Sequence, residues 1–218
     1  MGHHGWHHHD LTAAIGAPQA GSNAAGYVFD AQSTQHVIYL GALIGSDTHA
    51  HVQELWWDTH GWHHHDLSAA TGAPDAEVGP ACYVFNAQGT QHVVYVDLSL
   101  EAHVHELWWD TNGWHHHDLS AATGAPSAGY APLSGYVFDA QGTQHVIYLG
   151  SADLHIHELW WDTHGWHHHD LTVATGAPTP APTVGSGPAG YVFDAQGTQH
   201  VVYIGEYPDL HVYELWWG

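Results

Sequence analysis

The segment HVHELWWDTNGWHHHDL, residues 103–119, decides the fold because most of it recurs four times along the 218-residue chain. Its first half, Glu-Leu-Trp-Trp, begins at Glu54, Glu106, Glu158 and Glu214. Its second half, Gly-Trp-His-His-His-Asp-Leu, begins at Gly5, Gly61, Gly113 and Gly165. Copies lie 52 to 56 residues apart. Self-similarity at a fixed period of this length is typical of propellers and other repeat architectures.

Each repeat contains four short runs rich in Val, Ile, Tyr, Trp and Thr, which predict four strands. The first two runs are joined by Asp-Ala-Gln-Gly, as at 139–142, and the last two by Asp-Thr-His-Gly, as at 58–61. An early Asp and a late Gly suit a four-residue hairpin. The longer connections, rich in Ala, Pro, Gly and Thr, are expected to be surface loops.

Four antiparallel strands per repeat predict an all-β protein, a four-bladed β-propeller formed by one domain over residues 1–218. The expected blades span 27–67, 83–119, 136–171 and 191–217. The last of these lacks its fourth strand, and residues 6–11 are a lone copy of that strand. We therefore expect the N-terminal strand to complete the last blade and close the ring. The main alternative is that two chains pair into a larger ring.

Alternation along residues 103–110 places Glu106 and Trp108 on one face and Leu107 and Trp109 on the other. Because each blade face packs on a neighbouring blade, a cleft between blades should combine the Glu face of one with the second Trp of the next. His92 can lie beside Glu106 if the strand register allows it.

At these residues the chain resembles the fucose-binding propeller lectins of fungi and bacteria. The matching segments are 91–95 (Gln-His-Val-Val-Tyr), 105–110 (His-Glu-Leu-Trp-Trp-Asp) and 113–114 (Gly-Trp), and the resemblance covers nearly the whole chain. It implies that a strand cation and the Glu hold sugar hydroxyls, and that a Trp of the next blade covers the sugar. Where the family has Arg, this chain has His in every repeat.

The resemblance therefore implies a multivalent, lectin-like protein with up to four sites between blades, binding glycans or another small ligand. The expected ligand-binding residues are His36, Glu54, Trp57, His92, Glu106, Trp109, His145, Glu158, Trp161, His200, Glu214 and Trp217. His offers fewer donors than Arg, and it titrates near neutral pH. Sugar binding should therefore respond to pH. The alternative is that the Glu only hydrogen-bonds a neighbouring His between blades and that the Trp only fills the core.

The many histidines suggest a second function, a metal-binding protein or metalloenzyme. Imidazoles two residues apart on a strand can chelate Zn²⁺, Ni²⁺ or Cu²⁺. The candidate ligands are His63, His65, His103, His105, His155 and His157. The pattern changes in two repeats, where Gln53 and Tyr213 replace one of these histidines. The alternative is that they hydrogen-bond one another and backbone carbonyls between blades, so no cofactor is required and a transition metal is only an option.

The composition excludes several kinds of partner. The chain has no Lys or Arg, 22 Asp and Glu, and 27 His. Without cations it should bind neither nucleic-acid phosphates nor anionic membranes. No ordinary signal peptide is visible, which would fit a cytoplasmic or non-classically exported protein and leaves the location open. A homo-oligomer remains an option, and the single Cys82 forms no internal disulfide.

An enzyme is the less favoured interpretation. Catalysis usually needs one asymmetric site, whereas this chain offers four near-equivalent ones, and no nucleophile elbow is present in its sequence. Asymmetry could arise in the two irregular connections, residues 42–50 and 179–189.

Overall fold

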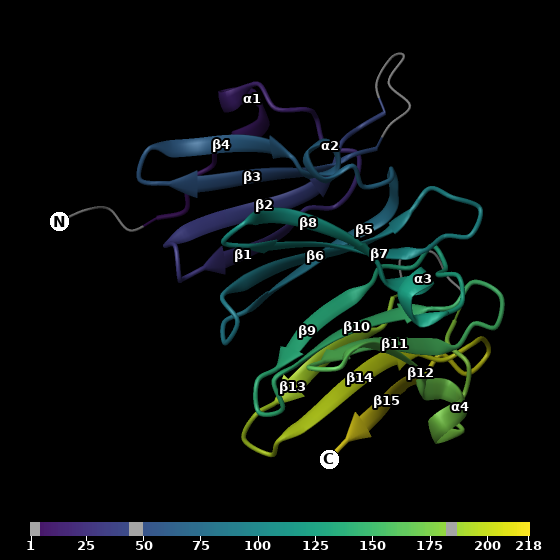
Figure 1. Cartoon of the computed structure of the whole chain (residues 1–218). Helices are drawn as coiled ribbons and strands as arrows, with labels where there is room; N and C mark the ends of the chain where they lie inside the picture. Colours follow the sequence, from purple (N-terminus) through teal and green to yellow (C-terminus); the bar gives the residue numbers. More distant parts are fainter. Residues whose placement is uncertain (1–4, 44–49, 182–186) are drawn as a thin grey trace.

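The computed structural model describes residues 5–43, 50–181 and 187–218, and these residues form four antiparallel sheets in chain order (Figure 1). The strand orders are β1-β2-β3-β4, β5-β6-β7-β8, β9-β10-β11-β12 and β13-β14-β15. This confirms the all-β prediction. The strands are β1 (Ala25–Phe29), β2 (Thr34–Leu40), β3 (Val52–Asp58), β4 (Gly61–Asp66), β5 (Ala76–Phe85), β6 (Thr90–Asp97), β7 (Val104–Asp110), β8 (Gly113–Asp118), β9 (Ser134–Phe138), β10 (Thr143–Leu149), β11 (Ile156–Asp162), β12 (Gly165–Asp170), β13 (Ala189–Phe193), β14 (Thr198–Ile204) and β15 (Val212–Trp217).

The tight hairpins form where the Asp-to-Gly turns predict them. The β3–β4 turn ends on Gly61 at φ 119°, and the β9–β10 turn ends on Gly142 at φ 67°. Both angles are costly for residues with a Cβ, which is why Gly closes these turns. In the β3–β4 turn the Asp58 carboxylate accepts a hydrogen bond from the backbone N–H of His60, as expected of a turn-forming Asp.

A short helix follows the fourth-strand motif in each described copy, where the sequence interpretation expected only a surface loop. The helices are α1 (Leu11–Ile15), α2 (Leu67–Thr71), α3 (Leu119–Thr123) and α4 (Leu171–Thr175). Asp66 caps α2 by accepting a hydrogen bond from the Ala69 N–H, and Gly72 ends it in the left-handed conformation. The signal for this helix was present as an Asp N-cap and a Gly C-cap six residues apart.

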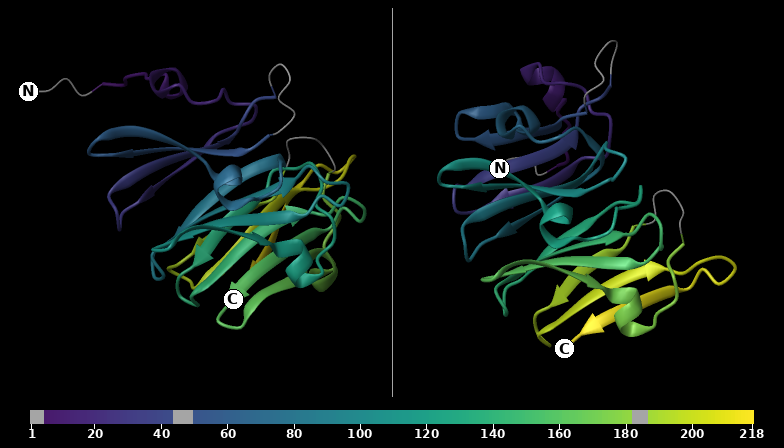
Figure 2. Two further views of the ribbon diagram at one scale, coloured as in Figure 1. Left: turned by 45° about the horizontal axis from the view of Figure 1, so that its top comes forward. Right: turned by 45° about the vertical axis from the view of Figure 1, so that its right-hand side comes forward.

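The core consists of layers of apolar side chains between consecutive sheets. One layer contains Ile38, Val52 and Leu67 from the first unit and Val93 and Leu107 from the second. Equivalent layers lie between the second and third sheets and between the third and fourth. The first strands of consecutive sheets lie next to each other, so the sheets are stacked face to face as blades are (Figure 2).

The lone N-terminal copy of the fourth strand does not pair with the last sheet in this structure. Residues 5–10 form no strand, and α1 lies beside β4 of the first sheet. The helix α1 lies by the first sheet, at the opposite end of the row of sheets from β15, in Figures 1 and 2. The last sheet therefore ends at β15, where Trp216 is 64 % exposed. Closure of the ring by residues 6–11 stays a prediction.

Two further points concern the described ranges. None of the helices described there has the length and apolar character needed to span a membrane. Residues 44–49 and 182–186 of the irregular connections at 42–50 and 179–189 fall outside the described residues.

Candidate ligand site between the sheets

The second and third strands of each sheet bring one His and one Glu together. The distance from His Nδ1 to Glu Oε1 is 2.8 Å in the first three sheets and 3.0 Å in the fourth. The two residues are not direct cross-strand partners, because Glu106 pairs with Val94 and His92 with Trp108. Their side chains meet diagonally on one face of the sheet. The pairs are His36–Glu54, His92–Glu106, His145–Glu158 and His200–Glu214.

The imidazole of each pair contacts a Thr hydroxyl and a Tyr ring as well as the Glu carboxylate. In the first sheet Thr34 Oγ1 lies 2.7 Å from His36 Nε2, and the Tyr27 ring stacks on the imidazole at 4.7 Å. If His36 donates from Nδ1 to Glu54, the Thr34 hydroxyl donates to Nε2, which fixes the tautomer. The same Thr and Tyr contacts recur in the other three sheets.

Each Glu of the first three pairs is buried, with 2 to 7 % of its surface exposed. Burial alone would raise the pKa of the Glu54 carboxyl, but the hydrogen bond from His36 and the nearby His65 imidazole outweigh it, and the pKa lies below its ordinary value. Glu54 is therefore a carboxylate at neutral pH. Its Oε2 atom lies 3.7 Å from His65 Nδ1 and keeps capacity to accept another hydrogen bond.

Indole rings from the next sheet face these pairs across two similar pockets of about 330 Å³ each. In the first pocket His36 and Glu54 lie opposite Trp109 and Trp114. The second pocket repeats the arrangement with His92, Glu106, Trp161 and Trp166. The expected combination of a Glu face with the second Trp of the next sheet is therefore present.

The third boundary differs in one respect. Its pocket, of about 120 Å³, places Glu158 and His169 opposite Trp216 and Trp217. Within the described residues the last sheet has no fourth strand, so no counterpart of Trp114 and Trp166 lines this pocket. This site is incomplete on one side.

The fourth expected site is divided between the two ends of the row. His200 and Glu214 lie in the last sheet, and Trp57 lies in the first. The Glu214 side chain is 47 % exposed, compared with 3 % for Glu54. The structure therefore brings three of the four expected residue sets together within the described chain.

Several lining residues were not predicted. Gln91 lines the first pocket and accepts a 2.8 Å hydrogen bond from the Tyr27 hydroxyl across the sheet boundary. The first Trp of each pair also contributes, as Trp56 and Trp108 do. The strict recurrence of Thr-Gln-His-Val was the available signal for the Gln, but alternation places Gln and His on opposite strand faces. Only the packing of two sheets shows that they serve neighbouring sites.

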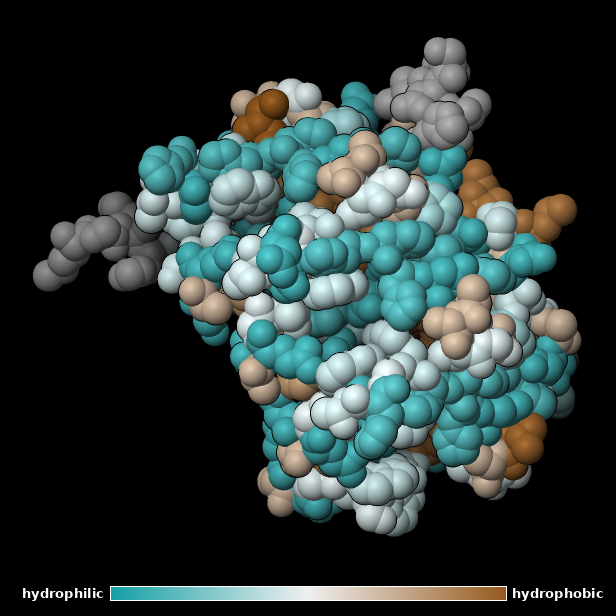
Figure 3. All heavy atoms as spheres, viewed as in Figure 1, coloured by the Kyte–Doolittle hydropathy of each residue, from teal (hydrophilic) through white to brown (hydrophobic). Residues whose placement is uncertain are grey.

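Hydrophilic and intermediate residues cover most of the face seen in Figure 3, and strongly hydrophobic residues occur there in small separate patches. Larger exposed apolar side chains include Trp6 and, on the last sheet, Val212, Trp216 and Trp217. The exposed apolar surface thus includes the two segments that the repeat pattern would pair.

The six metal-ligand candidates fall into two groups. His63 lies 3.0 Å from an Asp58 oxygen and stacks on Trp56, and His65 lies near Glu54. The other four, His103, His105, His155 and His157, lie with aspartates at the start of the third strands of the second and third sheets.

Burial raises the pKa of the Cys82 thiol to about 12, so Cys82 is not a reactive thiolate.

Comparisons with known proteins concern the fold. No family model and no curated protein matches the sequence. The SapL1 lectin, solved in complex with alpha methyl fucoside, is 17 % identical with a TM-score of 0.60 over 95 % of this chain and 62 % of that chain. The Aleuria aurantia lectin, described as a six-bladed β-propeller with a novel fucose recognition mode, is 14 % identical with a TM-score of 0.52 over 89 % and 57 %. The Hadza microbial sialidase Hz136 is 14 % identical with a TM-score of 0.54 over 84 % and 41 %.

These likenesses confirm the predicted resemblance at the level of the fold: the chain has the sheet arrangement of the fucose-binding β-propeller lectins. It spans about three-fifths of the length of the lectins it matches. A sialidase shares the same arrangement, so the fold by itself does not distinguish binding from catalysis.

Proposed function

We propose that this protein binds carbohydrates at sites between consecutive sheets. The observation that carries the proposal is the repeated placement of a buried His–Glu pair opposite an indole of the next sheet. A sugar presents hydroxyl groups at its edge and an apolar face of C–H groups. A carboxylate acceptor beside aromatic walls matches both surfaces.

The residues of each proposed site make different kinds of contact with the sugar. In the first site Glu54 Oε2 is the free acceptor for a sugar hydroxyl, and Trp109 and Trp114 offer the apolar platform. His36 holds the carboxylate through Oε1 and so orients it. This work is done by His where related lectins are expected to use Arg. The nearby Glu54 carboxylate raises the pKa of His65, which lines the same pocket, so binding should change between pH 6 and pH 8.

Fucosides are the first ligand class to test. The SapL1 lectin was solved with a methyl fucoside, and its fold covers nearly the whole of this chain. The His-for-Arg replacement alters the donor set, so galactose derivatives and methylated fucose belong in the same panel. Each site alone is expected to be weak. Repetition would supply avidity on a surface that carries many copies of the sugar.

We further propose that a copy of residues 5–10 completes the last sheet and thereby closes the blade ring. Support comes from equivalence, because β4, β8 and β12 have the same Gly-Trp-His-His-His-Asp sequence and each pairs with a strand like β15. In those sheets the first Trp of the third strand stacks on the first His of the fourth strand. In the first sheet these are Trp56 and His63, whose ring centroids lie 4.1 Å apart. The same register would stack Trp216 on His7 and place His9 beside Glu214. Donation within one chain gives the four-bladed propeller, and donation between copies gives the homo-oligomeric alternative.

Calorimetric titration tests the sugar proposal. Methyl α-fucoside, methylated fucose and methyl galactosides would be titrated into the protein at pH 6 and pH 8. Saturable heat with at least one sugar supports the proposal. The absence of heat with every neutral sugar at both pH values would contradict it and would leave the His–Glu pairs with a structural role.

A further inference from the structure

The second and third sheets each contain a cluster of histidines and aspartates that lies apart from the sugar-site residues. In the second sheet one ligand atom each from His103, His105 and Asp118 lies within 4.8 Å of the others. In the third sheet the same holds for Asp153, His157 and Asp170. His105 and Glu106 are consecutive on β7 and point to opposite faces of the sheet. The cluster and the sugar site are therefore separate.

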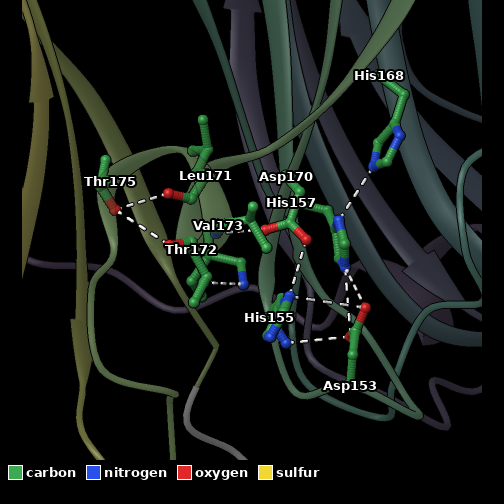
Figure 4. Close-up of polar contacts among 10 residues, drawn as sticks. Asp153, His155, His157, His168, Asp170, Leu171, Thr172, Val173 and Thr175 are labelled. Carbon is green, nitrogen blue, oxygen red and sulfur yellow. Dashed lines mark hydrogen bonds and ion pairs between the residues drawn. The ribbon is translucent and has the colours of Figure 1, made fainter.

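The two clusters share one plan. His103 Nδ1 lies 2.8 Å from Asp118 Oδ2, and His155 Nδ1 lies 2.8 Å from Asp170 Oδ2. The second imidazole of each cluster uses its Nδ1 for another His, since His157 Nδ1 lies 3.0 Å from His168 Nε2. Figure 4 shows His155, His157, Asp153 and Asp170 converging, with His168 on the far side of His157. Such outer hydrogen bonds fix the orientation of a ligand imidazole.

The carboxylate that faces the second imidazole comes from different places in the two sheets. In the second sheet it is Asp97, at the end of β6, and its Oδ2 lies 3.3 Å from His105 Nε2. In the third sheet the equivalent position is Gly150, and Asp153 supplies the carboxylate at 3.1 Å from His157 Nε2. A Cβ at Gly150 would overlap the Asp153 carboxylate, so this oxygen occupies the space of the missing Asp side chain. Two different sequences thus build the same acid–imidazole arrangement.

One atom in these clusters has no well-aligned hydrogen bond. His105 is 3 % exposed, and its buried Nε2 meets no hydrogen-bond geometry in the described chain, although the Asp97 carboxylate lies 3.3 Å away. A buried polar atom without a well-aligned partner destabilises the folded state and calls for an explanation. A bound cation on Nε2 would satisfy it.

We propose that each of these two clusters binds one divalent transition-metal ion of the Zn²⁺ type. Imidazole nitrogen and carboxylate oxygen are the ligands that Zn²⁺ takes alongside thiolate. Two aspartates at each cluster, Asp97 and Asp118 or Asp153 and Asp170, balance the charge of the ion. Ligand atoms around a tetrahedral Zn²⁺ lie about 3.4 Å apart, so separations of up to 4.8 Å need to contract by at most about 1.4 Å. The side chains of His103 and Asp118 are about one-quarter to one-third exposed, so a metal ion can reach the cluster from solvent.

Other repeats of the chain show which substitutions can test the two clusters and which can serve as controls. In the first sheet Gln53 replaces the second imidazole and lies 2.7 Å from His64 Nε2. His105→Gln and His157→Gln therefore install a pairing that the fold already accommodates. His60 and His164 are exposed turn residues, and Asn112 takes the same place in the second repeat. His60→Asn/His164→Asn removes two histidines outside the clusters.

The experiment titrates ZnCl₂ into chelator-treated protein that has never contacted an immobilised-metal column, and it counts bound zinc by elemental analysis after gel filtration. A competing chelator of intermediate affinity suppresses weak binding by the remaining histidines. The wild type and His60→Asn/His164→Asn should retain two zinc ions per chain, each single Gln variant one, and the double Gln variant none. Zinc should also raise the Tm of the wild type and not that of the double Gln variant. Equal zinc content in the wild type and the double Gln variant, or no retained zinc in the wild type, would overturn the proposal. Circular dichroism confirms that the variants are folded.

Discussion

The Nδ1 atom of His92 lies 2.8 Å from the Oε1 atom of Glu106, and both side chains are almost completely buried between the second and third sheets. Their burial makes this contact part of the folded structure as well as part of the proposed site. A change at Glu106 should therefore affect stability even without ligand.

Replacing Glu106 by Ala should lower the free energy of unfolding by about 2 kcal/mol, because it removes a charged acceptor and leaves His92 Nδ1 buried without a partner. Glu106→Gln retains an acceptor oxygen and should cost less. Urea unfolding at pH 7 measures both values. Glu101→Ala is the control, since the Glu101 side chain is 76 % exposed and its removal should cost little. Equal effects of Glu101→Ala and Glu106→Ala would contradict this view of the pair.

Replacing Trp161 by Ala should weaken sugar binding at the second boundary by about tenfold, through the loss of an aromatic platform worth roughly 1.4 kcal/mol. Calorimetry should then show one site fewer than in the wild type. Trp57→Ala is the matched control, because Trp57 occupies the equivalent position in the first sheet and faces no His–Glu pair within the described chain. A loss of binding in Trp57→Ala as large as in Trp161→Ala would indicate a closed ring with a working fourth site.

The pH dependence of stability should carry a contribution from His65. The pKa of its imidazole lies above the ordinary value of 6.5 because the Glu54 carboxylate, 3.7 Å away, favours the charged form. The folded state thus binds this proton more tightly than the unfolded state does. The stabilisation is complete below about pH 6.5 and is lost as the pH rises through the folded value. The advantage of the wild type over His65→Asn in urea unfolding should therefore shrink from pH 6 to pH 8.5, and an advantage that grows would contradict the assignment.

Completion of the last sheet can be detected by a disulfide. In a Cys82→Ser background, His7→Cys and Trp216→Cys should cross-link on mild oxidation if residues 5–10 pair with β15. His63→Cys/Trp56→Cys is the positive control, since these two residues are direct partners in the first sheet. On a non-reducing gel, an intramolecular bond keeps the mass at 23.8 kDa, whereas exchange between copies gives about twice that mass. If only the control pair cross-links, the sheet ends at β15.

The repeats and their alternation were sufficient to predict the strands, the tight hairpins and the Glu-to-Trp arrangement, because these depend on local pattern and on a period of two. The helices after Asp66 and its equivalents were missed because five-residue helices carry little periodicity. Their N-cap Asp and C-cap Gly can nevertheless be recognised in the sequence. The contribution of Gln91 and Trp114 to a neighbouring site follows from packing between sheets, which a single strand does not encode. The Asp153 carboxylate was missed for a similar reason, since it reaches its place from a turn.

The hydrogen bond from Tyr27 to Gln91 has equivalents at the other two boundaries, Tyr83 to Gln144 at 3.2 Å and Tyr136 to Gln199 at 3.1 Å. The second and third sheets thus each present a donor to one neighbour and an acceptor to the other, and every boundary in the described chain uses the same complementary pair. Insertion or deletion of one whole repeat would leave this hydrogen bond intact at each remaining boundary. A longer or shorter row of sheets therefore needs no new partner for the Tyr donor and the Gln acceptor.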